Sequence, residues 1–209
     1  GITAVVAVAC AVVLGYASRR STAAAVHAAQ RVASLGYAIP GAVIAVGVLV
    51  PLAGLDNLIA DALRERFGVR TGLLLTGTII ALVYAYLVRF LAIAMQSVEA
   101  GLVRITPSMD DAARSLGLGP RAALARVHVP MLRGSVTVAL LLVFVDVMKE
   151  LPATFALRPF NTDTLAVHIY NLAKDERLGE AALPSLALVL VGLVPLVILS
   201  RQMARGARR

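Results

Sequence analysis

The stretch TPSMDDAARSLGLGPRAALARVHVPMLR, residues 106–133, is a polar, arginine-rich island between long apolar runs. Its first half has the features of a helix start. Thr106 is a favoured N-cap residue, and Pro107 takes the first helical position, where its missing N–H costs nothing. Asp110 and Asp111 fall in the first turn, where the positive end of the helix dipole stabilises acidic side chains. These residues predict a short helix that begins after Thr106.

A second short helix is predicted in the other half of the same stretch. Gly117 is expected to end the first helix, because glycine readily takes the left-handed conformation that is common just after a helix. Gly119 and Pro120 then open the second helix, and Pro130 is expected to stop it just before the next apolar run. The predicted form is a helix–glycine–helix elbow, a shape that fits a groove of another protein.

The composition is typical of a membrane protein. Of the 209 residues, 59% are apolar and 15% are charged, and the mean hydropathy is +0.85. A soluble domain is nearer half apolar and a quarter charged. The net charge of +8 invites a nucleic-acid interpretation, but the basic residues flank apolar runs instead of forming a patch with aromatic residues. We therefore predict membrane lipid, and no nucleic acid, as a partner.

Five apolar segments approach the roughly 20 residues that a membrane-spanning helix needs. We predict spans at residues 1–18, 32–55, 71–95, 134–151 and 181–200. The fourth segment has 12 uncharged residues, Gly134–Val145, and so has to run on through Asp146. The expected fold is all-α and polytopic, a single transmembrane domain over residues 1–209 with the 106–133 loop inside it. Because the sequence begins at Gly1 within an apolar run, we expect it to be a fragment.

The basic residues near the span ends predict the orientation, because cytoplasmic loops are enriched in lysine and arginine. The side that carries the 106–133 loop holds thirteen of them: Arg19, Arg20, Arg31, Arg89, Arg104, Arg114, Arg121, Arg126, Arg133, Arg201, Arg205, Arg208 and Arg209. The other side holds seven: Arg64, Arg66, Arg70, Lys149, Arg158, Lys174 and Arg177. The loop and the C-terminus are therefore predicted to be cytoplasmic.

The loop resembles the EAA loop of the membrane subunits of binding-protein-dependent ABC importers. The matching positions, with the family's spacing, are Asp111, Ala112, Ala113, Gly117, Val127, Val129 and Pro130. The sequence departs from the family by Asp111 in place of the usual glutamate, and by valine in place of the usual isoleucine and leucine. The resemblance implies that these residues couple the chain to a separate ATPase subunit.

Two further stretches, residues 35–52 and 146–186, resemble the ferric-iron branch of these permeases, which also includes thiamine-type relatives. Members usually carry two homologous halves, and this sequence resembles most of the second. The resemblance implies an iron(III) permease of the bacterial inner membrane. It would work with two copies of the ATPase subunit, a periplasmic substrate-binding protein and a second permease half. Import of thiamine or another small solute by the same machinery is the alternative.

Three charged residues lie at or near membrane depth at the end of the fourth span. Asp146 and Glu150 are four residues apart and share a helix face, and Lys149 is adjacent to both. One interpretation is a charged lining of the translocation path, since such residues normally face a cavity or each other. The other is an internal ion pair between Lys149 and one of the two acids.

The sequence shows no pattern for catalysis, metal binding or ATP binding. It has no nucleophile–base pair and no phosphate-binding glycine loop, and Cys10 and the three histidines show no metal-ligand spacing. We therefore predict a transport subunit that is not an enzyme and holds no cofactor. Two other classes stay open, namely a secondary transporter and an integral membrane enzyme. The first would need internal repeats, and the second a cluster of polar groups at the spans.

Overall fold

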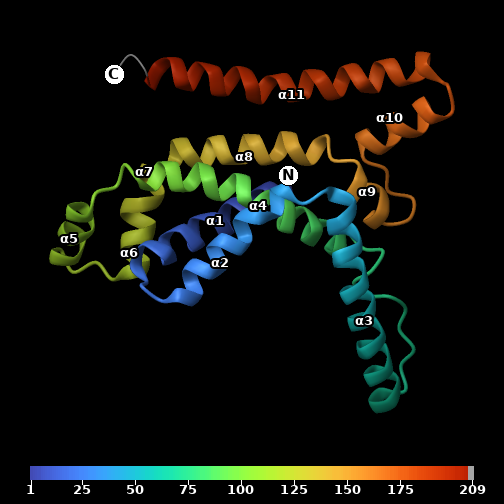
Figure 1. Cartoon of the computed structure of the whole chain (residues 1–209), viewed down its shortest axis with the longest axis horizontal. Helices are drawn as coiled ribbons and strands as arrows, with labels where there is room; N and C mark the ends of the chain where they lie inside the picture. The colour runs from blue at the N-terminus through green and yellow to red at the C-terminus, as the bar shows by residue number, and fades with distance from the viewer. Residues whose placement is uncertain (207–209) are drawn as a thin grey trace. The chain divides into compact units, whose positions relative to one another are not determined.

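The computed structural model describes residues 1–206, and these residues form helices without a strand (Figure 1). Arg208 and Arg209 of the predicted basic tail lie outside the described residues. In chain order the elements are α1 (Ile2–Arg20), α2 (Ala24–Leu35), η1 (Gly36–Ala38), α3 (Gly41–Phe67), α4 (Ile79–Leu102), α5 (Pro107–Ser115), α6 (Pro120–Ala123), η2 (Leu124–His128), α7 (Val129–Met131), α8 (Arg133–Met148), α9 (Pro152–Leu157), α10 (Leu165–Lys174) and α11 (Leu178–Gly206).

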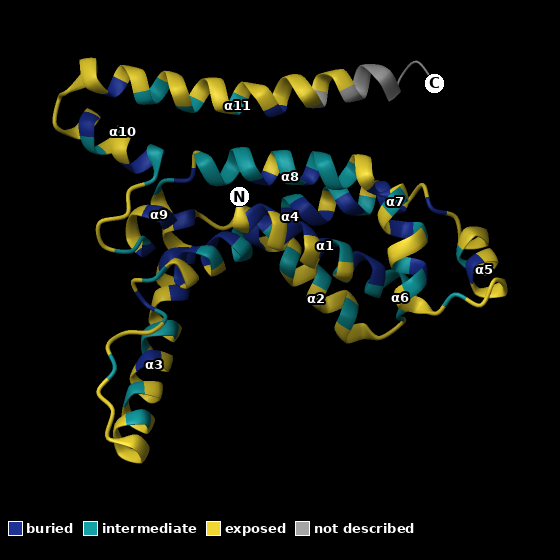
Figure 2. Ribbon diagram, turned by 180° about the vertical axis from the view of Figure 1, so that it is seen from behind, coloured by how far each residue is buried: buried dark blue, intermediate teal, exposed yellow. Residues whose placement is uncertain are grey.

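The predicted class, an all-α polytopic membrane protein, is confirmed. Within the described residues, α1, α3, α4 and residues Leu178–Ile198 of α11 are long and apolar enough to cross a membrane. Most side chains of α11 are exposed, as expected for a helix that faces lipid or another subunit (Figure 2). A fifth crossing requires Pro120–Met131 and Arg133–Met148 together, two helical segments that meet at 74°. The 16 residues of α8 alone reach about 24 Å, short of the roughly 30 Å hydrocarbon layer.

Several predicted span boundaries were wrong. Pro40 is the N-cap of α3 and does not interrupt a helix, because the span begins at Gly41. The same helix runs on to Phe67 through residues 56–67, which had been assigned to a connection. The third span, α4, lies at Ile79–Leu102, later than predicted. Hydropathy alone therefore does not locate the ends of these helices, because a helix can extend through charged residues beyond its apolar part.

The described chain divides into two compact units. Unit one combines Gly1–Tyr37 with Phe90–Phe144, and unit two combines Ala38–Arg89 with the chain from Val145 onward. In unit one, α1 carries small buried residues spaced four apart, Ala7, Ala11 and Gly15. Gly15 lies against α4, where an added Cβ would be 2.9 Å from the end of the Leu102 side chain, so Leu102 would have to shift to make room for a larger residue.

In unit two, Asp56 of α3 holds the connection that leads to α4. Its carboxylate is 2% exposed and accepts the backbone N–H groups of Leu74, Leu75 and Thr76, at 3.0, 2.8 and 2.7 Å. The hydroxyl of Thr76 bonds to the same carboxylate. These bonds fasten residues 74–76 alongside the helix and satisfy backbone donors that lie outside any helix.

This arrangement predicts that Asp56→Asn loosens the connection. The amide loses the negative charge and one acceptor oxygen, and hydrogen bonds to a charged acceptor are stronger than bonds to a neutral one, so we expect a lower unfolding temperature. The measurement is thermal unfolding of the detergent-solubilised protein, together with the rate at which a protease cuts residues 70–78.

The matched control is Asp61→Asn, at an exposed acid of the same helix. It should leave both the unfolding temperature and the cleavage rate unchanged. Equal behaviour of the two variants would mean that the bonds to Asp56 contribute no stability.

Candidate coupling surface

The first half of the 106–133 loop forms a short helix, α5, that ends as the sequence predicts. Gly117 has φ of +77°, in the left-handed region. The N–H of Gly117 bonds to the carbonyl of Arg114 at 2.9 Å, and the N–H of Leu118 bonds to that of Ala113 at 3.0 Å. This pair of bonds is the Schellman motif. The prediction that Gly117 ends the first helix is confirmed.

Two details at the start of α5 differ from the prediction. Thr106 is the N-cap residue, but its side chain makes no bond to a helix N–H. Its hydroxyl lies 2.8 Å from that of Ser108 instead. Asp110 lies in the first turn, as predicted, whereas Asp111 lies beyond it. The helix dipole therefore stabilises Asp111 less than its sequence position implied.

The second half of the loop begins at Pro120, as predicted, but Pro130 does not stop it. The helix continues through α6, η2 and α7 to Met131 and turns sharply at Leu132. Proline lacks an N–H, and its ring crowds the carbonyl of the residue four positions earlier. The chain absorbs this in η2, a π-helical segment in which the N–H of Val129 bonds to the carbonyl of Leu124. The prediction that Pro130 ends the helix was wrong for this reason.

The seven residues that match the family motif divide into exposed and buried positions. Asp111, Ala112, Gly117 and Val129 are exposed, whereas Val127 and Pro130 are half-buried. Ala113 is buried and packs the helix onto the molecule. The side chain of Asp111 is 62% exposed and forms an ion pair with Arg114, three residues along the same helix. The exposed positions give α5 a polar outer surface that a partner protein can reach.

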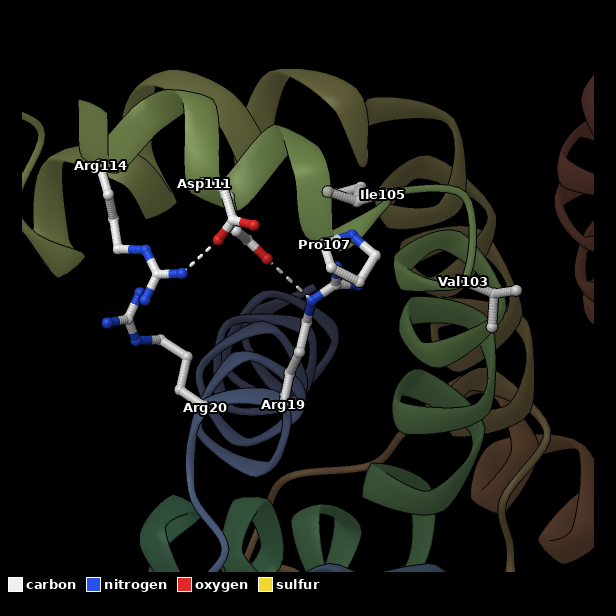
Figure 3. Close-up of a pocket in the computed structure, with 8 residues that line it drawn as sticks. Arg19, Arg20, Val103, Ile105, Pro107, Asp111 and Arg114 are labelled. Carbon is white, nitrogen blue, oxygen red and sulfur yellow. Dashed lines mark hydrogen bonds and ion pairs between the residues drawn. The ribbon is translucent and has the colours of Figure 1, made fainter. Parts of the chain in front are cut away.

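Beside this surface lies a groove of about 510 Å³, shown in Figure 3. Three arginine side chains surround it: Arg19 and Arg20 come from the end of α1, and Arg114 comes from α5 (Figure 3). The two adjacent carboxylates of α5, Asp110 and Asp111, also line it. The groove therefore carries charges of both signs, which suits a polar protein surface better than an apolar ligand.

Asp110 ties the two halves of the loop together. One carboxylate oxygen lies 2.6 Å from Nε2 of His128, which is fully buried in the second half. The other oxygen accepts a bond of 3.1 Å from Nε of Arg19. Because an ionised carboxylate can only accept, the Nε2 of His128 must carry the proton in this bond.

The surroundings of Asp110 keep it ionised. Burial alone would raise the pKa of Asp110, but the hydrogen bond and charge of His128 and the charge of Arg19 outweigh burial and hold that pKa below its usual range. Because the folded-state pKa is lowered, the stabilisation is present above the ordinary carboxyl pKa and is lost as pH falls through the lowered one. The bonds of Asp110 to His128 and Arg19 therefore stabilise the loop fully at neutral pH.

Sequence reasoning missed the roles of Asp110 and His128. Asp110 was assigned to the helix dipole, and His128 was considered only as a metal ligand. The two residues are 18 positions apart, and their contact depends on how the loop folds back at Gly117. A histidine within a half-buried helical segment was the one available signal, because such a group needs a polar partner.

The three charged residues near the end of α8, namely Asp146, Lys149 and Glu150, form two different ion pairs. Lys149 forms an ion pair with Asp146, at 2.6 Å between Nζ and the carboxylate. Glu150 instead turns inward, with a side chain that is 2% exposed, and pairs with Arg89 of α4 at 3.4 Å. It also accepts the N–H groups of Ala153 and Thr154 in the first turn of α9, at 3.1 and 3.2 Å. That these charged residues line the translocation path stays a prediction.

Arg89 had been counted among the basic residues at a span end, and this was wrong. Arg89 lies well inside α4, where it pairs with Glu150. The space around the pair is tight, because a Cβ at Gly41 would lie 2.2 Å from the guanidinium and 2.4 Å from the carboxylate. A charged residue that is paired inside a span gives no information on which side of the membrane a loop lies. Without Arg89, twelve basic residues remain on the side of the 106–133 loop, against seven on the other side.

Comparison with known proteins gives relatives of one kind. The chain is 26% identical, over 201 residues, to the Fe(3+)-transport system permease protein FbpB 2 of Haemophilus influenzae; the match covers 96% of this chain and 37% of that protein. It is 29% identical over 172 residues to the Salmonella typhimurium protein PhnV, which is assigned as the permease of a 2-aminoethylphosphonate transport system. That match covers 82% of this chain and 60% of PhnV. No protein-family model matches the chain.

The fold has a counterpart among solved structures. A bacterial ABC transporter involved in the import of the acidic polysaccharide alginate superposes with a TM-score of 0.68, at 16% sequence identity. The superposition covers 97% of this chain and 77% of that chain. The chain spans much less than the full length of its sequence relatives, 37% and 60%, which fits one half of a longer permease. In sequence and in fold, the chain therefore resembles the permease subunits of ABC importers, as the 106–133 loop predicted.

Proposed function

We propose that this chain is the second half of the membrane permease of a bacterial ABC importer for iron(III). The helices would form part of the translocation path in the inner membrane. A periplasmic binding protein would deliver the substrate, and two ATPase subunits would bind the 106–133 loop of this half and its counterpart in the other half. The observation that carries this proposal is the form of the loop, a rigid elbow with Asp111 exposed on its outer surface.

The exposed ion pair on α5 supports an ATPase contact at Asp111. A surface pair such as Asp111 with Arg114 typically contributes between 0 and 1 kcal/mol. A basic group on a partner can therefore replace Arg114 at little cost. Within such an interface, the carboxylate would be less exposed to water and its attraction to a cation stronger. Asp110, being mostly buried and already bonded twice, is a poor candidate for the same role.

The proposal of iron(III) rests on the likeness to FbpB 2, which covers nearly the whole chain. The likeness to PhnV favours a second candidate substrate, 2-aminoethylphosphonate, at similar identity. Among the described residues, no group of three histidine, cysteine or acidic side chains is placed to hold a metal ion. The proposal therefore leaves the recognition of iron to the binding protein.

We predict that Asp111→Ala weakens binding of the ATPase and lowers transport at least tenfold. Removing one member of a charge pair buried at an interface typically costs about 2–5 kcal/mol, and 1.4 kcal/mol is a factor of ten. Transport, co-purification of the ATPase and abundance in the membrane should be measured on the same samples. Abundance should stay normal, because Asp111 is exposed and contributes little to folding.

Two variants control this experiment. Asp111→Glu keeps the charge and restores the residue usual in the family, so it should retain transport. Ser115→Ala removes an exposed polar group from the same helix and should have no effect. If Asp111→Ala lowers abundance as much as it lowers transport, Asp111 has a structural role and is not the contact with the ATPase.

The orientation of the loop is tested by labelling from either side of the membrane. After the native, exposed Cys10 is replaced by serine, single cysteines are placed at the exposed positions Arg121 and Asn161. A membrane-impermeant thiol reagent should label position 121 from the cytoplasm and position 161 from the periplasm, because the basic residues favour the loop side as cytoplasmic. Labelling of position 121 from the periplasm would end the proposal, since no ATPase could reach the loop.

The substrate is tested by uptake in cells that lack the intact permease. These cells should lose binding-protein-dependent uptake of radioactive ferric iron and keep uptake of both thiamine and 2-aminoethylphosphonate. Restoring the gene should restore iron uptake. Loss of 2-aminoethylphosphonate uptake with normal iron uptake would identify 2-aminoethylphosphonate as the substrate in place of iron(III). The proposed coupling to the ATPase would be unaffected.

A further inference from the structure

The last turn of α1 contacts the 106–133 loop through a cluster of polar and aromatic residues. We call the four residues Tyr16, Arg19, Asp110 and His128 the α1 clamp. Two of them come from α1, one from α5 and one from η2. The contacts are remote in sequence, because Arg19 and Asp110 are 91 positions apart. All four residues belong to unit one.

Arg19, a residue of α1, bonds both to the loop and to the end of α4. Its Nε donates a bond of 3.1 Å to Asp110 of α5, and one of its terminal nitrogens donates a bond of 2.9 Å to the carbonyl of Leu102. Leu102 is the last residue of α4, and its carbonyl also accepts the backbone N–H of Ile105 at 3.0 Å, so Arg19 adds a second bond at the end of this helix. The planar guanidinium can make both bonds in fixed directions, which a lysine could not do. Arg19 therefore fixes α1 both to the end of α4 and to the loop.

Tyr16 joins α1 to the second half of the loop. Its hydroxyl donates a bond of 3.0 Å to the carbonyl of Pro120, the first residue of α6. Its ring packs edge-on against the imidazole of His128, with 4.8 Å between the ring centres. Tyr16 and His128 are both buried, so water does not compete with these contacts. Through Arg19 and Tyr16, α1 therefore holds both halves of the elbow.

We propose that Asp110 and Arg19 are positioning residues that make α1 move together with the 106–133 loop. The loop is also linked covalently to α4 and α8, but it meets them at residues 103–106 and at Leu132, where helical structure is broken. The contacts of the α1 clamp connect the loop directly to α1, without either of these breaks in between. When an ATPase displaces the loop, the displacement therefore passes into the membrane through α1. This inference rests on the proposed function of the loop.

The experiment uses the complete importer, with its ATPase and binding protein, in lipid vesicles. Asp110→Asn and Arg19→Gln should keep the ATPase bound and ATP hydrolysis running, but should lower the amount of solute transported per ATP. Allosteric couplings between sites are typically 5–150-fold, so we expect a loss on the order of tenfold. The loss in the double variant should be smaller than the product of the two single losses, because both variants weaken the shared bond between Arg19 and Asp110.

A direct readout follows the distance between α1 and α5. Spin labels at the exposed positions Thr22, just after α1, and Ser115, at the end of α5, should give the same distance in the nucleotide-free and ATP-trapped states. In Asp110→Asn that distance should change between the two states. Arg104→Gln, at an exposed arginine near the same helix ends, is the matched control and should behave as the unaltered protein.

The outcomes separate this inference from the proposed function. If no ATPase binds the unaltered permease, the proposed function itself fails. If the ATPase binds and the variants transport the normal amount of solute per ATP, the proposed function stands. The α1 clamp would then not pass the displacement of the loop to α1. Loss of ATPase binding in Asp110→Asn would overturn the inference, since Asp110 would then shape the docking surface. If Asp110→Asn is not inserted, Tyr16→Phe decides by the same two readouts; this variant removes the hydroxyl that donates to Pro120 and accepts from Arg20, and leaves the ring in place.

Discussion

A carboxylate that is largely removed from water stands at each of three breaks between helices. Asp56 accepts the backbone N–H groups of the connection before α4, and Glu150 accepts the first N–H groups of α9. Asp110, in the first half of the elbow, accepts side-chain bonds from His128 in the second half and from Arg19 of α1. A helix satisfies its own backbone, but a break leaves backbone donors without partners, and Asp56 and Glu150 accept such donors. An ionised carboxylate can accept several bonds at once, and bonds to a charge are stronger than neutral ones. Each of these three groups therefore joins segments that a break in the helix would otherwise leave apart.

Adjacent residues of α5 are used in opposite ways. Asp110 and Asp111 have the same side chain, but their side chains are 18% and 62% exposed. Helical geometry turns consecutive residues by about 100°, so one points toward α1 and η2 and the other points outward. The inner carboxylate gives the loop its rigidity. The outer carboxylate presents a charge to a partner on a surface that is already rigid, so little conformational entropy is lost on binding.

Close packing between α1 and α4 is the condition for the contacts around Asp110. Gly15 lies against Val98 and Leu102 at the end of α4, and its lack of a side chain allows the two helices to approach there. This approach brings the next turn of α1 within reach of the Leu102 carbonyl and of α5. A larger residue at Gly15 would press on the side chain of Leu102, the residue whose carbonyl Arg19 bonds. Small-residue packing in the apolar part thus sets the geometry of the polar loop.

Much of the architecture was predictable from local properties. The length of the apolar runs predicts a polytopic helical protein, because a span of given thickness needs a given number of residues. The hinge of the elbow was predictable because φ at Gly117 is positive, which glycine adopts without strain. The matching loop spacing predicted the kind of relatives found. Each of these inferences uses residues within a few positions of one another.

The rest was decided by tertiary structure. Pro130 stays within a helix because η2 widens to accommodate it, and Arg89 lies inside α4 because Glu150, 61 positions later, neutralises it. Asp110 finds Arg19 from 91 positions away. Sequence by itself determined where the chain can be helical and where it must turn. It could not determine which buried charges meet, because charge pairs form between segments that only helix packing brings together, and that packing depends on the shapes of many side chains at once.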